Sequence, residues 1–154
     1  MGLRRSIDHL IGQLINELPV QGRSVQDLVG HFQGSKTAIL EHAQKVGDSE
    51  YNRRVLSHII GIERWGQSRL RVFLGEPLVL DEYNAYRPAR EATWPVLLQG
   101  FADTRDETIR LAQQLASDSL AVPTVLHNQF GPLTAKGWLQ YLSAHASRER
   151  YGIH

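Results

Sequence analysis

The chain has 154 residues and a nearly balanced charge, with 17 lysine and arginine side chains, 16 aspartate and glutamate side chains and 7 histidines. Because no basic face dominates, a nucleic acid is a poor candidate for a partner. The sequence contains no cysteine, which excludes disulfides and thiolate metal sites and suits a cytoplasmic protein. Charged residues interrupt the apolar pattern of residues 1–18, so we expect neither a signal peptide nor a membrane span there.

The length fits a single domain over residues 1–154, divided into an additional N-terminal helix within residues 1–20 and a core over residues 24–154. Apolar residues recur at helical spacing over residues 3–18, and Pro19 follows directly. This pattern predicts an amphipathic helix. The helix either covers one face of the core or takes part in a dimer contact, and the sequence does not choose between these roles.

Two long helical patterns open the core. Ser24 to Asp27 match a capping box, and the helix that they begin is expected to end at Gly47. The second pattern covers residues 53–75 and ends at a glycine that is soon followed by a proline. Its apolar stripe consists of Val55, Ile59, Ile62, Gly66, Leu70 and Phe73.

Two further helices are expected at residues 93–116 and 134–153, after connections over residues 78–91 and 117–133. The second connection is expected to hold short extended pieces at 122–126. The inner row of the last helix is expected to contain Trp138, Tyr141, Leu142, His145 and Glu149. The sequence therefore predicts an all-α fold, a bundle of four core helices with one extra N-terminal helix.

Three polar side chains on the two helices at 53–75 and 134–153 indicate a function. His58 lies on the flank of the apolar stripe, and His145 and Glu149 are about 40° apart on one helical face. Such groups are costly to bury unless something binds them. Two imidazoles and one carboxylate, completed by water, would form an open metal site of the catalytic kind.

Other interpretations of the same residues stay open at this point. The two histidines are also compatible with a bundle core in which they bond to backbone or hydroxyl groups. Glu149 would then pair with Arg64 or Arg148. Metal-free acid–base hydrolysis by Glu149 and His145 is a third possibility, but the sequence offers no nucleophile or oxyanion group for it.

Two stretches together resemble the DinB/YfiT-like superfamily: LSHIIGIERWGQSRL and, far downstream, HNQFGPLTAKGWLQYLSAHASRE. The first fits the family pattern HxxxxExxxxxRL with His58, Glu63, Arg69 and Leu70. The second contains the turn from Phe130 to Thr134 that leads into the last core helix of the family, which carries a histidine and another four residues later. The resemblance extends over roughly residues 25–153.

This resemblance implies an up-down four-helix bundle, often a homodimer, with a divalent metal held by three histidines. It also implies likeness to enzymes that use low-molecular-weight thiols, such as thiol S-transferases and the mycothiol-dependent maleylpyruvate isomerase. His58 and His145 match the first two metal ligands, and Glu149 stands where the family has its third histidine. Zinc, nickel, iron and manganese are the candidate metals, and the negative carboxylate favours the harder ions iron(II) and manganese.

The leading hypothesis is a metal-dependent enzyme that acts on a small molecule, either a thiol-dependent S-transferase or a hydrolase. A small thiol is a plausible cosubstrate because the chain has no cysteine nucleophile. The candidate substrate-binding residues are Trp65, Arg69, Trp94 and Tyr141, each of which is also compatible with a structural role. The alternative is a non-catalytic dimeric bundle with a degenerate metal site.

Overall fold

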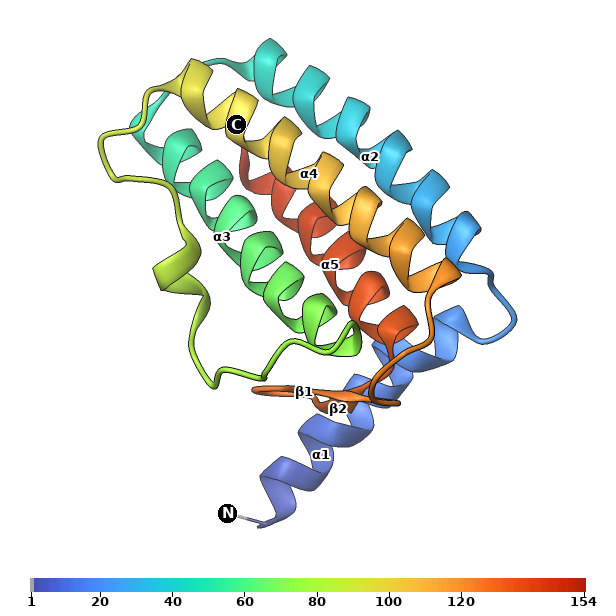
Figure 1. Cartoon of the computed structure of the whole chain (residues 1–154). Coiled ribbons are helices and arrows are strands. Elements are labelled where there is room, and N and C mark those ends of the chain that lie inside the picture. The colour runs from blue at the N-terminus through green and yellow to red at the C-terminus, as the bar shows by residue number, and fades with distance from the viewer. Residues whose placement is uncertain (1) are drawn as a thin grey trace.

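Four long helices form the body of the computed structural model, which describes residues 2–154 and the side chains from residue 4 onward. They are α2 (Val25–Val46), α3 (Glu50–Phe73), α4 (Trp94–Ser117) and α5 (Ala135–Glu149). The predicted all-α helical bundle is confirmed (Figure 1). No helix within residues 2–154 is both long enough and apolar enough to cross a membrane.

Side-chain caps set the starts of three of these helices. The predicted capping box of α2 is present: Ser24 Oγ accepts from Asp27 N, and the Asp27 carboxylate accepts from Ser24 N. Ser49 Oγ caps α3. Thr134 Oγ1 caps α5 by accepting from the backbone N–H of Gly137.

Helix α3 runs parallel to α4 and antiparallel to α5. Gln67 of α3 donates to the Thr104 carbonyl of α4, and one turn further along both helices Arg71 donates to the Glu107 carboxylate, so α3 and α4 point in the same direction. The connection over residues 74–93, which contains the 3-10 helix η3 (Tyr83–Tyr86), returns the chain to the starting end (Figure 1). Helix α5 runs antiparallel to α3, so the last turn of α5 lies beside the first turns of α3.

A close approach between α3 and α5 occurs at Gly66. A Cβ atom built at this position would overlap the side chain of Leu142, which is 1% exposed and therefore has little room to move. The contact lies between His58 and the end of α3, on the face that α5 covers. The absence of a side chain at Gly66 allows the two helices to pack at this short separation.

A buried ion pair joins α3 to α4. Arg105 Nη2 donates to Glu63 Oε2 at 2.9 Å, and neither side chain is more than 2% exposed. Arg105 Nε also lies 2.8 Å from Glu63 Oε1 but is not aligned as a hydrogen bond. The Thr108 hydroxyl donates to the Glu63 carboxylate, and the Ser35 hydroxyl accepts from Arg105. The Arg105 guanidinium lies over the ring of Phe32. Charges buried in this way are tolerated because each has partners.

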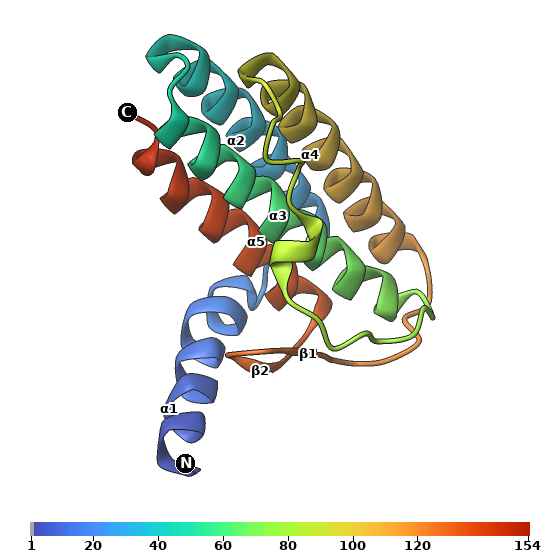
Figure 2. The same ribbon diagram turned by 90° about the vertical axis from the view of Figure 1, so that its left-hand side faces the viewer.

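The N-terminal helical run projects beyond one end of the bundle (Figures 1 and 2). It consists of α1 (Gly2–Gly12), the π-helix η1 (Gln13–Glu17) and the 3-10 helix η2 (Leu18–Val20). A helical run is therefore confirmed over the predicted region, but its second part is not α-helical. Its apolar residues are exposed by 39–60%: Ile7, Leu10, Ile11, Leu14, Ile15 and Leu18.

A short hairpin precedes α5 and lies beside α1 (Figure 2). Its strands are β1 (Val125–His127) and β2 (Gly131–Leu133), paired antiparallel, which agrees with the extended pieces predicted nearby. His127 Nδ1 accepts from the backbone N–H groups of Gln129 and Phe130 and so organises the turn. Its ring is 4% exposed and packs against Trp65, Trp138 and Tyr141.

The C-terminal helix ends earlier than predicted. α5 stops at Glu149, and the 3-10 helix η4 (Arg150–Gly152) follows, because Ile153 is drawn into the core and is 1% exposed. The Ile153 carbonyl accepts a hydrogen bond from His42 Nε2 at 2.8 Å. This contact fixes the end of the chain against α2.

Gly66→Ala tests the close approach of α3 and α5. We expect the substitution to lower the free energy of unfolding by about 1–3 kcal/mol, because an added methyl group overpacks a filled core. Gly34→Ala in α2 is the matched control: nothing lies within 4 Å of its Cβ position, so higher helix propensity should stabilise it by up to about 1 kcal/mol. Urea unfolding measures both, and a Gly66→Ala protein as stable as Gly34→Ala would contradict the packing argument.

His127 should make stability depend on pH. Burial lowers its pKa from 6.5 to about 4, so between these values the unfolded chain binds the proton and the folded chain does not. Stability is therefore retained above pH 6.5 and lost as the pH falls, by up to about 1.4 kcal/mol per pH unit from this group. His127→Asn keeps an acceptor for the turn but cannot titrate.

Urea unfolding of the chelator-treated protein at pH 6.5 and pH 5 measures this dependence. We expect the wild type to lose about 1.6 kcal/mol more than His127→Asn over this interval, since other titrating groups contribute equally to both proteins. Equal losses in the two proteins would show that His127 titrates normally.

Candidate metal centre

Two imidazoles from distant parts of the chain meet between α3 and α5. His58 Nε2 lies 3.2 Å from His145 Nε2, with the ring centroids 5.0 Å apart. Two ligand atoms each about 2.05 Å from one ion are separated by about 2.9 Å at a right angle and about 3.3 Å at the tetrahedral angle. The observed separation falls between these values, so one ion can contact both nitrogens.

A carboxylate lies one helical turn beyond the second imidazole. Glu149 Oε1 is 4.0 Å from His145 Nε2, and one ligand atom from each of the three side chains lies within 4.8 Å of the others. Two imidazoles and a carboxylate are a donor set that divalent transition metals accept. The cluster of His58, His145 and Glu149 could therefore bind a divalent metal.

The arginines that compete for Glu149 hold it weakly or not at all. Arg148 Nε and Nη2 both lie 3.4 Å from Glu149 Oε1, and the Arg148 side chain is 72% exposed. An exposed pair of this length contributes little to stability. Arg64 donates to the Thr104 hydroxyl instead. The carboxylate thus remains available to a cation beside the imidazoles.

Burial keeps both histidines neutral. Burial lowers the pKa of His58, although the negative charge of Glu149 acts in the opposite direction. Burial, together with the neighbouring His58 and Arg148, lowers the pKa of His145 to about 3. Metal binding requires unprotonated imidazole nitrogen. Near pH 7 the two rings therefore need not lose a proton before they bind a metal.

The cluster lines a cavity of about 400 Å³, a volume that suits a small molecule. Its wall includes residues from η1, the hairpin and α5: Ile15, Asn16, Gln129, Phe130, Tyr141, Ala144 and Arg148. Burial raises the pKa of Tyr141 to about 12, so its hydroxyl keeps its proton at neutral pH. The cavity therefore combines apolar walls with hydrogen-bond donors.

Three of the four expected substrate-binding residues lie outside the lining of this cavity. Arg69 is 1% exposed and pairs with Asp81 at 3.0 Å, while its guanidinium covers the ring of Trp65. Trp65 itself is 3% exposed and donates to the Asp81 carbonyl. Trp94 is 7% exposed in the apolar core. Tyr141 alone of the four lines the cavity.

Ile15 and Asn16 complete the cavity wall, and the sequence pattern did not point to them. Both lie in an amphipathic helical pattern in which Ile15 looks like an ordinary apolar residue and Asn16 like an ordinary polar one. Their place in the wall depends on the π-helical turn of η1 and on its packing against α5. Helical periodicity alone gives no signal for either feature.

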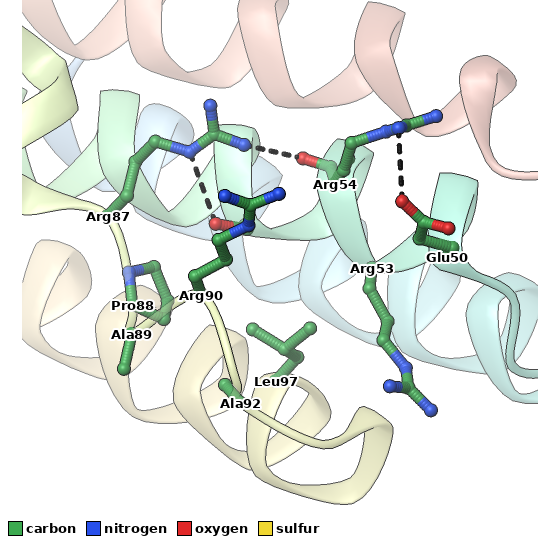
Figure 3. A pocket seen from close by; sticks show the side chains of 10 residues that line it. Glu50, Arg53, Arg54, Arg87, Pro88, Ala89, Arg90, Ala92 and Leu97 are labelled. Atoms are coloured by element: carbon green, nitrogen blue, oxygen red, sulfur yellow. Dashed lines mark hydrogen bonds and ion pairs between the residues drawn. The ribbon is translucent and has the colours of Figure 1, made fainter.

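A second cavity of about 420 Å³ lies between the start of α3 and the connection before α4 (Figure 3). Its charged wall contains Arg53, Arg54, Arg87 and Arg90. Asp48 pairs with Arg53 and Glu50 pairs with Arg54. The Ser57 hydroxyl accepts a hydrogen bond from Arg87. Two of the four arginines are paired with carboxylates, and no histidine or unpaired carboxylate among the described residues lines this cavity, so the cluster of His58, His145 and Glu149 is the better candidate for a metal site.

Residues 22–149 match the family model described as the DinB superfamily, a span that contains all three residues of the cluster and leaves the whole N-terminal helical run outside. No curated protein and no solved structure matches the chain significantly. Since the family model covers far more than half of its length, the chain belongs to the DinB superfamily.

Proposed function

We propose that this chain is a divalent-metal-dependent enzyme that acts on a small molecule, with His58, His145 and Glu149 as the metal ligands. The observation that carries the proposal is the 3.2 Å separation of the two Nε2 atoms at the wall of a cavity. Two neutral imidazoles and one carboxylate leave coordination positions free, as an open catalytic site requires. The carboxylate favours iron(II) or manganese over zinc or nickel.

A divalent ion at this point supplies Lewis acidity, which polarises a carbonyl group or lowers the pKa of a thiol or of water. The chain contributes the surrounding groups. Tyr141 Oη retains its proton and can donate it in a hydrogen bond to a ligand oxygen. A cosubstrate must bring any thiol, since the chain has no cysteine. A thiol-dependent S-transferase or a hydrolase is the reaction class that we propose.

Manganese titration tests the ligand set. A ligand that binds only the folded state stabilises it by about 2.7 kcal/mol at a concentration of 100 times its Kd. We expect Mn²⁺ to raise the unfolding temperature of the chelator-treated wild type and to have little effect on His58→Ala or His145→Ala. Thermal unfolding followed by circular dichroism measures the shift.

The control variant for this titration is His31→Ala, because His31 is exposed on α2 and distant from the cluster in sequence. It should respond to Mn²⁺ like the wild type. If Mn²⁺, Fe²⁺, Zn²⁺ and Ni²⁺ each raise the unfolding temperature of the wild type no more than that of His145→Ala, the proposed metal site is wrong, and the proposed enzyme with it.

The alternative function, a non-catalytic dimeric bundle, is favoured by the exposed apolar face of the N-terminal run. Leu10, Leu14 and Leu18 are each more than half exposed, and Ile7, Ile11 and Ile15 accompany them. Apolar surface gathered on one projecting helix favours burial against another protein surface. We propose that a second copy of the chain covers this face, which is compatible with either function.

Sedimentation velocity tests the dimer. The double variant Leu10→Glu/Leu14→Glu should sediment as a monomer at concentrations where the wild type is dimeric, because charges at an apolar contact are costly to bury. Leu80→Glu is the control, since Leu80 is 72% exposed on the connection before α4. A monomeric wild type throughout the micromolar range would contradict the proposed dimer.

A further inference from the structure

The cavity of about 420 Å³ between the start of α3 and the connection before α4, which we call the arginine cavity, is separate from the candidate metal centre. Among the described residues, the two cavities share no lining residue. Four arginines and one acid line the arginine cavity, and the rest of its wall is built from Ser57, Pro88, Ala89, Ala92 and Leu97. Its volume is large enough for a small organic molecule.

Two of the four arginines are paired with acids at the start of α3. Arg53 donates two hydrogen bonds to the Asp48 carboxylate, at 2.6 and 2.5 Å. Arg54 lies 3.4 Å from Glu50, and these two side chains are 65% and 87% exposed, so this second pair contributes little to stability. The two acids balance the charges of Arg53 and Arg54 and leave those of the other two arginines.

Neutral acceptors hold the Arg87 guanidinium in place. Its Nε donates to the Ser57 hydroxyl at 3.2 Å and its Nη2 to the Arg54 carbonyl at 3.0 Å (Figure 3). Neither acceptor carries a charge, so the guanidinium is oriented but not neutralised. These bonds use two of its five N–H groups, and the others can donate to a ligand.

Gly61 makes room for the stem of Arg87. A Cβ atom at Gly61 would overlap Arg87 Cγ and would lie 3.3 Å from the carbonyl oxygen of Tyr83. The connection therefore lies closely against α3 at this point. Because this packing and the two hydrogen bonds already order the Arg87 side chain, a ligand has little side-chain freedom to remove when it binds.

Arg90 supplies a second charge that no acid balances. Its side chain is exposed and makes no hydrogen bond or ion pair within residues 2–154. In Figure 3 it extends from the connection toward α3, on which Arg87 is held. Glu91, the next residue, does not line the cavity. Two like charges at one cavity repel each other, and a bound anion between them replaces this repulsion by attraction.

We propose that the arginine cavity binds a small organic phosphate monoester, with the phosphate held by Arg87 and Arg90. A phosphate monoester carries close to two negative charges above pH 7, which matches the two unbalanced arginines, whereas a carboxylate carries one. The guanidinium fork fits two phosphate oxygens at once. The organic group of the ligand lies on the apolar part of the wall, which is formed by Pro88, Ala92 and Leu97.

Calorimetric titration with phenyl phosphate at pH 8 tests the proposal. The full-length protein is treated with a chelator, so that no metal holds the ligand, and is kept at low ionic strength because salt screens exposed charges. We expect phenyl phosphate to bind about tenfold more tightly than benzoate, which has one charge, or inorganic phosphate, which has no apolar group.

Arg90→Gln removes one of the two unbalanced charges from an exposed side chain without a partner, so the fold should be unaffected. It should weaken the Kd of phenyl phosphate by about tenfold, because hydrogen bonds to charged groups are the strong ones. Arg5→Gln is the matched control: Arg5 is exposed on α1 and does not line the cavity. His145→Ala, altered in the candidate metal centre, should bind phenyl phosphate like the wild type.

Equal Kd values for the wild type and Arg90→Gln, or no heat of binding to the wild type, would overturn the proposal. Benzoate or inorganic phosphate that binds as tightly as phenyl phosphate would reject the organic phosphate as the ligand class. Binding that is lost in His145→Ala and kept in Arg90→Gln would assign the ligand to the other cavity. Failure of the proposed metal-dependent enzyme changes none of these expected results, since the titration contains no metal.

Discussion

The candidate site depends on how closely α3 and α5 approach each other. Gly66 presents no side chain to Leu142, and the two helices can therefore pack at a separation that any larger residue would increase. Two imidazoles projecting from opposite helices share one ion only within a few tenths of an ångström of the right distance. His58 and His145 meet at 3.2 Å because this packing is tight. Gly66, which makes no polar contact itself, thus helps to set the distance between the two imidazoles.

Residues of the family pattern divide between the site and the scaffold. Of the motif that contains His58, Glu63 and Arg69, only the histidine belongs to the candidate metal cluster. Glu63 pairs with Arg105 in the core, and Arg69 anchors the long connection through Asp81. The first ion pair holds α3 to α4, and the second holds the connection over residues 74–93 to α3. Both pairs are kept because a buried charge is costly to leave unpaired. A charged residue in a family motif is therefore not by itself a sign of contact with substrate.

Much of the fold could be predicted from sequence, because caps and apolar spacing act locally. The capping box at Ser24 and the convergence of His58 with His145 and Glu149 both follow from patterns within single helices together with the family resemblance. The burial of Arg69 and the position of Asn16 could not be predicted, since they depend on contacts between distant segments. Asn16 in particular required the change from α- to π-helix, which periodicity does not reveal.

An anomalous difference map for manganese, recorded from crystals of the full-length protein grown with Mn²⁺, would locate a bound ion. We predict a single strong peak between α3 and α5, within about 2.0–2.3 Å of His58 Nε2, His145 Nε2 and a carboxylate oxygen of Glu149. A map without a peak at this point, with Glu149 turned to Arg148 and the two imidazoles bonded to each other, would contradict it and leave only the helical scaffold.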